Sequence, residues 1–262
     1  MRKLVVGATL SLLGAASLAF AQTVSVRVDS SAPRVRPEAS RFDPVVLTYI
    51  ATLRQATDSA RSLGERSVQL ARTTYAGEQA WEIVETHGAG ANASVDTLVT
   101  DYFTLTPLHW GATQQMPTSG SMAAAARVVM EFRADSMIGV ISAPSGRRTI
   151  VAPMPGGAFL TASHAETALR GLPIGAGWHD SVSVVVTDVS KSTVVPAALV
   201  VTGEGHLITT AGTFDCWVLS LATEVGKTQY WVSKADRIVV QTSQVLPESG
   251  DVLLYTLTRI SH

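Results

Sequence analysis

The sequence predicts a mainly β fold, in which one large antiparallel sheet curves into a half-open barrel and one or two short helices lie across its mouth. Three observations support this prediction. About a dozen segments have strand character, and turn signals separate them at intervals of about 8 to 14 residues. No repeat of about 20 to 50 residues is visible, so a solenoid is not indicated. A sheet with so many strands is expected to curl, because a flat one would leave long exposed edges.

The start of the chain has the pattern of a secretory signal peptide, over residues 1–21. A basic start is followed by an apolar run over residues 4–20 and by a small-x-small cleavage site that ends at Ala21. The run is short for a membrane span, and Gln22 stands where a lipid-anchored protein would have Cys. We therefore expect cleavage after Ala21, a soluble periplasmic or secreted protein, and no stable membrane insertion.

Residues 22–42 are predicted to be a linker that precedes a single antiparallel β domain over residues 43–262. An alternating piece at residues 24–29 suits an edge strand, whereas Pro33 and Pro37 interrupt regular structure. The formal net charge is −1 and basic residues are not concentrated anywhere, so a nucleic-acid partner is not expected. Cys216 is the only cysteine, which excludes an internal disulfide, so the core alone must hold the fold.

The first half of the domain contains seven expected strands. Residues 45–53 are ambiguous, because Asp43-Pro44 is a good helix start while the run itself is rich in β-branched residues; we favour a strand. The strands that follow are easier to assign, since apolar and polar residues alternate and glycine-rich turns separate them. They are expected over residues 67–75, 80–86, 94–101, 126–133, 137–142 and 148–152.

One short helix is expected at residues 163–170, where Ser163-x-x-Glu166 has the capping-box spacing and Gly171 follows as a stop. Strands resume after it, at residues 181–187, 197–202, 206–210, 212–221, 228–234, 238–242 and 252–259. Both faces of the segment 214–221 are largely apolar, which is unusual for a strand with one wet face. We therefore expect either the helix or an apolar guest to cover its second face.

The sequence shows no reaction centre, so no enzymatic activity is expected. The six histidines do not have metal-ligand spacing, there is no nucleophile elbow, and the glycine pairs do not lie at strand-to-helix junctions as a phosphate loop requires. His179 and His206 each lie near a carboxylate in sequence and are interpreted as exposed turn residues. Cys216 is interpreted as a small buried hydrophobic residue. We expect no catalytic residue, no metal and no cofactor.

The aromatic residues on strands or strand starts are the candidate ligand-binding residues. Two interpretations stand: they pack the core, as buried aromatics usually do, or they line a cavity on the concave face for an apolar or lipid-like ligand. The alternative function is a structural or protein-interaction module of the cell envelope with a filled core. The candidates are Trp81, Trp178, Phe214, Trp217, Tyr230 and Trp231.

Several segments resemble an uncharacterised family of exported bacterial β-rich domains, itself similar at a distance to the LolA/LolB and LppX-type lipoprotein carriers. The resemblance extends over about residues 43–259 and rests on the segments 95–99, 105–108, 168–173, 177–178, 211–218, 230–235, 238–242 and 246–247. It implies a half-open barrel with a helix across its mouth, a concave apolar face, and a strand at residues 45–53. It implies no catalytic residues. From the apolar strand beside aromatic residues we expect an apolar or lipid ligand, or an envelope protein, as partner.

Overall fold

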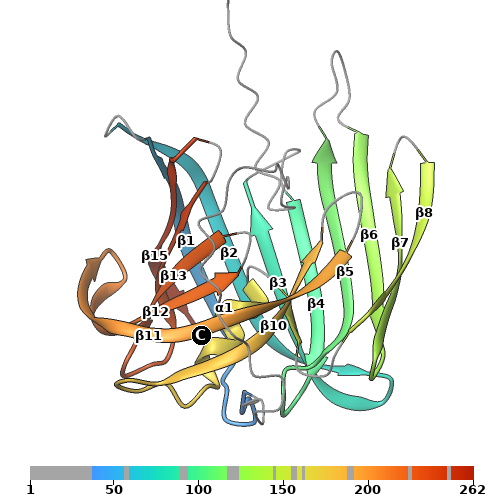
Figure 1. The fold of residues 1–262 in the computed structure, drawn as a ribbon, viewed down its shortest axis with the longest axis horizontal. Coiled ribbons are helices and arrows are strands. Elements are labelled where there is room, and N and C mark those ends of the chain that lie inside the picture. Colours follow the sequence, from blue (N-terminus) through green and yellow to red (C-terminus); the bar gives the residue numbers. More distant parts are fainter. Residues whose placement is uncertain are drawn as a thin grey trace, which may run out of the picture.

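The computed structural model describes residues 37–55, 59–88, 94–116, 124–143, 146–154, 158–160, 163–187, 192–223, 226–246 and 249–262. These residues form one fifteen-stranded sheet in the order β8-β7-β6-β5-β4-β3-β2-β1-β15-β14-β13-β12-β11-β10-β9, with one helix (Figure 1). Neighbouring strands are antiparallel, except that the short β9 joins β10 in parallel. The predicted fold class is therefore confirmed: a large, curved antiparallel sheet that strand pairing does not close.

The elements follow one another mostly as hairpins, so strands adjacent in sequence are also adjacent in the sheet. Their bounds are β1 Val45–Arg54, β2 Ala60–Tyr75, β3 Glu78–His87, β4 Ser94–Asp101, β5 Pro107–Met116, β6 Ala124–Phe132, β7 Ser136–Ala143, β8 Gly146–Pro153, β9 Ala158–Leu160, α1 Ser163–Arg170, β10 His179–Thr187, β11 Ser192–Thr209, β12 Gly212–Thr223, β13 Gly226–Ser233, β14 Val239–Val245 and β15 Val252–Ser261.

Most local predictions agree with these bounds. The segment after Pro44 is strand β1, so its helical interpretation is wrong; its β-branched residues pair with β2 on one side and β15 on the other. The helix α1 ends at Arg170, directly before Gly171, as predicted. Strand β5 was not predicted, because Pro107 and a polar second half give its sequence a weak strand pattern.

One prediction was wrong in its topology. Residues 197–202 and 206–210 were expected as two strands, with glycines 203 and 205 in a turn between them, but β11 runs through both. The register with β12 shifts between Val201 and Gly203, so the irregularity is a β-bulge inside one long strand. A Cβ at Gly205 would lie 3.3 Å from the indole of Trp231, so the glycine allows that side chain to approach the backbone.

The helix α1 lies on the concave side of the curved sheet (Figure 1). The helix contacts β3, β9, β13 and β14, and β11 reaches β8 from the other end of the sheet. Accordingly, Ile150 and Ala152 of β8 share one hydrophobic cluster with Val184 of β10 and Val195 of β11. The curled sheet thus encloses a core although its end strands do not pair.

The folded domain includes the end of the segment that was expected to be a linker. Ala39 and Phe42 are buried in the core, and the Ala39 backbone N–H donates to the Phe103 carbonyl. The Glu38 N–H donates to the carbonyl of Gly171, directly after α1. The expected signal peptide and the rest of the linker, up to residue 36, lie outside the described residues. Within the described part of the chain, no helix has the length and apolar character that a membrane span needs.

Candidate functional site

The helix α1 fills the concave side of the sheet with its own side chains. Residues His164 to Leu169 are all buried. His164 Nε2 lies 2.9 Å from the Leu105 carbonyl, and burial lowers the pKa of this histidine to about 4. The space between the helix and strands β1 and β2 measures only about 10 Å³, which is about the volume that one water needs. The concave face at this position is thus occupied by the protein itself.

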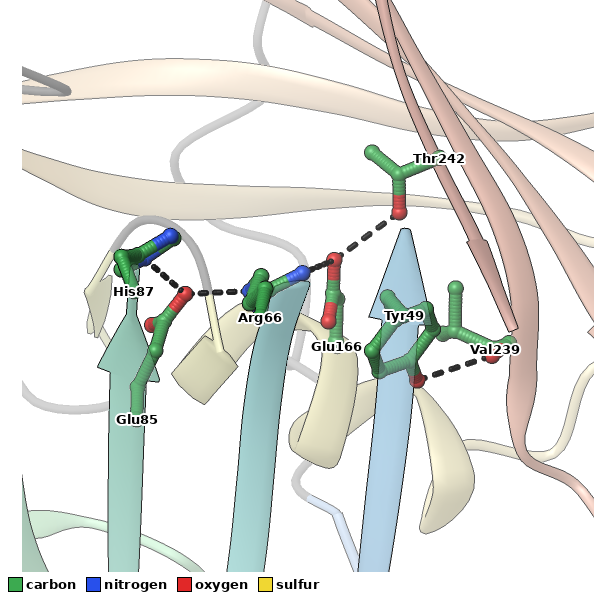
Figure 2. A network of polar contacts seen from close by, with 7 residues as sticks. All are labelled: Tyr49, Arg66, Glu85, His87, Glu166, Val239 and Thr242. Carbon is green, nitrogen blue, oxygen red and sulfur yellow. Dashed lines mark hydrogen bonds and ion pairs between the residues drawn. The ribbon is translucent and has the colours of Figure 1, made fainter. Parts of the chain in front are cut away.

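A buried ionic network fixes the helix to the sheet (Figure 2). Arg66 of β2 donates to Glu85 of β3 and, at 2.9 Å, to Glu166 of α1. The Thr242 hydroxyl of β14 donates to the same Glu166 oxygen at 2.8 Å, and His87 Nε2 lies 2.7 Å from Glu85. Glu166 therefore bonds to the sheet through one oxygen, and its other oxygen has no partner, so Glu166 does not bond back to the start of its own helix.

The surroundings of Arg66 stabilise its charged form. Burial alone would lower its pKa, but the nearby carboxylates of Glu166 and Glu85 raise it well above the usual value. The guanidinium carbon also lies over two aromatic rings, 5.3 Å from the centre of Tyr49 and 4.8 Å from that of Tyr255. The network joins four elements around one cation, and none of its groups is a nucleophile. Its arrangement is that of a structural anchor.

Asp96 adds a further carboxyl group to this cluster. It pairs with Glu85 across β3 and β4. Burial, followed by the negative charge of Glu85, raises the pKa of Asp96 to about 6, although His87 and Arg66 act in the opposite direction. A carboxyl group whose pKa is raised in the folded state favours folding when protonated, and this contribution is lost as the pH rises through 6.

Replacing Asp96 by Asn should therefore stabilise the protein at high pH. We expect Asp96→Asn to raise the free energy of unfolding at pH 8 by on the order of 1–3 kcal/mol, with the difference shrinking toward pH 4. Urea unfolding of both proteins between pH 4 and 8 measures this, with the exposed Asp236→Asn as the matched control. A destabilising effect that is equal at all pH values would contradict the assignment.

The six aromatic candidates do not form one surface. Trp81 is fully buried, stacks on Tyr102 with ring centres 5.4 Å apart, and donates from Nε1 to the Tyr102 carbonyl. The others divide between two hydrophobic clusters. Phe214 belongs to the same cluster as Trp81, and Trp231 packs on it from the side. Tyr230 belongs to the second cluster, which contains Leu169 of α1 and Leu172 just after the helix. Trp178 and Trp217 pack at the edge of this second cluster.

The two faces of β12 are both covered, as its sequence predicted. Leu219 is fully buried in the cluster that includes Leu169 of α1, so the helix takes part in covering this face. Cys216, on the opposite face, is fully buried in the main cluster. The tip of the β11–β12 hairpin folds back onto β15, where Thr210 Oγ1 donates to the Thr258 carbonyl at 3.0 Å. Protein atoms thus take the place that an apolar guest was considered to fill.

His179 and His206 lie on strands, and Cys216 lies in the core. His206 lies on β11, not in a turn, and its Nδ1 is 2.9 Å from Asp215, an exposed pair. His179 starts β10, with Nδ1 3.3 Å from the Gly177 carbonyl. Burial raises the pKa of the Cys216 thiol to about 11, so the thiolate is disfavoured. The described residues contain no cluster of three or more metal-ligating side chains.

A hollow of about 560 Å³ lies on the side of β6, β7 and β8 that faces away from the core. Val128 and Met130 of β6 point into the core, so the alternate residues of that strand face the hollow. We call this feature the outer hollow. Its lining residues are Arg127, Val129, Glu131, Ile138, Gly139, Val140, Ser142, Arg147 and Thr149.

Strand pairing places the residues that line the outer hollow in rows across β6, β7 and β8. The first row places Arg127, Ser142 and Arg147 side by side on β6, β7 and β8, and the next places Val129, Val140 and Thr149. The third row holds Glu131 with Ile138 of β7. The outer hollow is therefore basic at one end and apolar in the middle, and none of the six aromatic candidates lines it. The sequence does not predict the outer hollow, because the alternation of apolar and polar residues in β6 indicates a solvent-exposed face but not a depression in it.

Comparison with known proteins supports the fold alone. No protein-family model matches the chain, and no curated protein does so. The β-barrel-like protein of domain of unknown function DUF1849 from Brucella abortus is similar in structure, with a TM-score of 0.52 and 12% sequence identity over 84% of this chain and 98% of that chain. A candidate lipoprotein from Parabacteroides distasonis has a TM-score of only 0.32, with 15% identity over 84% of this chain and 96% of that chain, and supports no inference. The chain thus has a barrel-like β fold that also occurs in a bacterial domain of unknown function.

Proposed function

We propose that this chain is an exported, non-catalytic binding domain that holds an apolar or lipid-like ligand in the outer hollow. The main support for this proposal is the outer hollow, a space of about 560 Å³ whose floor is formed by Val129, Ile138 and Val140. This volume lies within the range of about 300 to 1,000 Å³ that is typical of small-molecule sites. Each methylene buried there would contribute about 0.8 kcal/mol.

This proposal moves the ligand away from the place that the sequence suggested. The six aromatic candidates were expected to line a concave cavity, but α1 packs on that face and leaves only about 10 Å³ beside β1 and β2. Trp81, Phe214 and Tyr230 are buried in protein contacts. The outer face of β6 to β8 has half-buried valines and an isoleucine with open space above them, which supports binding there.

Export and the absence of catalysis belong to the same proposal. The signal-peptide pattern of residues 1–21 supports a periplasmic or secreted location with cleavage after Ala21. The buried network contains carboxylates, a guanidinium and an imidazole but no nucleophile placed beside a base. The partner expected from the sequence is a lipid ligand or an envelope protein, and the distant similarity of the resembled family to lipoprotein carriers agrees with this.

A second candidate function is a structural or interaction module of the cell envelope with a filled core. The filled concave side favours it, since residues His164 to Leu169 are all buried there. Under this alternative the outer hollow would hold no small molecule. The two functions are distinguished by whether a ligand occupies that hollow.

A charge placed on the floor of the outer hollow should strongly weaken ligand binding. We expect Val140→Asp to weaken binding of the neutral fluorescent probe N-phenyl-1-naphthylamine by at least about tenfold, because a buried carboxylate opposes an apolar guest. Fluorescence titration measures this. Val245→Asp, at an exposed position on β14, is the matched control and should bind the probe as the wild type does.

The natural occupant can be sought directly. Mature protein purified under mild conditions should release a lipid on solvent extraction, which mass spectrometry would identify, and Val140→Asp should carry less of it. Absence of any guest in the wild type, together with probe binding that Val140→Asp leaves unchanged, would refute ligand binding in the outer hollow and favour the structural module.

A further inference from the structure

The outer hollow has one strongly basic end. Arg127 and Arg147 lie in the same row on either side of Ser142, across three neighbouring strands. Strands are spaced by about 4.8 Å, so the two arginine backbones are about 10 Å apart and their long side chains can converge on one group. Both residues are exposed, and in the described part of the chain neither guanidinium has an ionic partner.

The acidic residue at the other end does not neutralise this pair. Glu131 lies four residues from Arg127 along β6, a distance of about 13 Å in a strand. Its carboxylate is already engaged: Tyr75 donates to one oxygen at 2.6 Å, and His109 Nδ1 lies 2.6 Å from the other. The two arginines therefore remain available at the edge of an apolar floor.

We propose that the ligand of the outer hollow is a long-chain fatty acid anion, with its carboxylate bound by Arg127 and Arg147 and its chain lying over Val129, Val140 and Ile138. This inference rests on the proposed function and adds the chemical class of the ligand to it. A planar guanidinium matches a carboxylate with two parallel hydrogen bonds, which a neutral head group cannot accept equally well. The Ser142 hydroxyl, between the two arginines, can donate a further bond to the same oxygens.

The order of the rows supports a single-chain amphiphile. Charge lies at one end, the valines and Ile138 follow, and Val151, which is 69% exposed, pairs with Ile138 and continues the apolar surface to the edge strand β8. A ligand with a compact anionic head and an extended apolar tail would match this sequence of surfaces along one direction. A polar solute without a tail would leave the apolar floor uncovered.

The test compares palmitate with hexadecanol, which has the same chain length and no charge. Both are titrated as competitors of N-phenyl-1-naphthylamine against the wild-type protein. We expect palmitate to bind at least about tenfold more tightly than hexadecanol, with a preference that decreases as salt is added. The double variant Arg127→Gln/Arg147→Gln should lose this preference and still bind hexadecanol.

The matched control removes the same charge elsewhere. Arg54 and Arg61 are exposed at the end of the β1–β2 hairpin, so Arg54→Gln/Arg61→Gln should keep the wild-type preference for palmitate. Equal binding of palmitate and hexadecanol by the wild type would overturn the fatty acid assignment while leaving the proposed function intact. If neither competitor nor the probe binds, the proposed function itself fails. Loss of the preference in both double variants would also overturn the assignment, because it would show a general effect of net charge.

Discussion

Arg66→Met should lower the free energy of unfolding by about 3–5 kcal/mol, because it leaves the buried carboxylates of Glu85 and Glu166 without a compensating cation. Both side chains of each ion pair are almost completely buried, so water cannot replace the lost partner. The substitution keeps a long, unbranched side chain, which limits the change in packing. Denaturant unfolding at pH 7, followed by tryptophan fluorescence, measures the loss.

The contribution of charge can be separated from that of packing. Arg61→Met, on the exposed part of the same strand, removes an equal charge from the surface and should change stability by no more than about 1 kcal/mol. Adding Glu166→Gln to Arg66→Met should restore part of the lost stability, since one uncompensated charge is then absent. If the double variant is no more stable than Arg66→Met alone, the ionic interpretation of the network is wrong.

The network explains why one small helix can determine the interior of the sheet. An eight-residue helix is too short to be stable alone. Glu166 fixes it to β2 through Arg66 and to β14 through Thr242, while Leu169 packs in the second hydrophobic cluster. A buried polar group with demanding geometry favours one placement of the helix over others. Arg66→Met should therefore also weaken the protection of the α1 amides against hydrogen exchange.

The parts of the fold that depend on local sequence were predictable. The stop at Gly171 determined where α1 ends, and the alternation of Val128 and Met130 with charged residues assigned β6. A turn was wrongly predicted at Gly203, because glycine is common both in turns and in bulges, and only the pairing with β12 distinguishes them. A glycine in a turn and a glycine in a β-bulge therefore look the same in a single sequence.

The candidate sites could not be predicted, because they depend on contacts between distant segments. Arg66 and Glu166 are 100 residues apart in the chain, so their pairing follows only from the packing of α1 on the sheet. Arg66 does lie in phase with the buried Val68 and Leu70 of β2, which is a signal for an inward-facing charge once the strand phase is known. The outer hollow likewise requires the register of three strands.

Trp81→Ala should lower the free energy of unfolding by about 3–5 kcal/mol, because it removes the largest fully buried side chain of the core. The indole stacks on Tyr102, lies 6.3 Å from the ring of Phe42, and satisfies the Tyr102 carbonyl. Trp217→Ala should cost clearly less, about 1–2 kcal/mol, since Trp217 is half-buried at the edge of its cluster and contacts Lys234 from the side of the solvent. Denaturant unfolding of both variants measures the difference.

The same pair of variants tests whether the aromatic residues belong to the core or to a ligand site. If they only pack the core, Trp81→Ala and Trp217→Ala should keep the wild-type affinity for N-phenyl-1-naphthylamine under conditions where each variant remains folded, because neither side chain lines the outer hollow. Val140→Asp should show the opposite pattern: little loss of stability at a half-buried outer position and a large loss of affinity. Weaker probe binding by Trp217→Ala without a loss of stability would instead place the ligand on the face of β12, as the sequence alone had suggested.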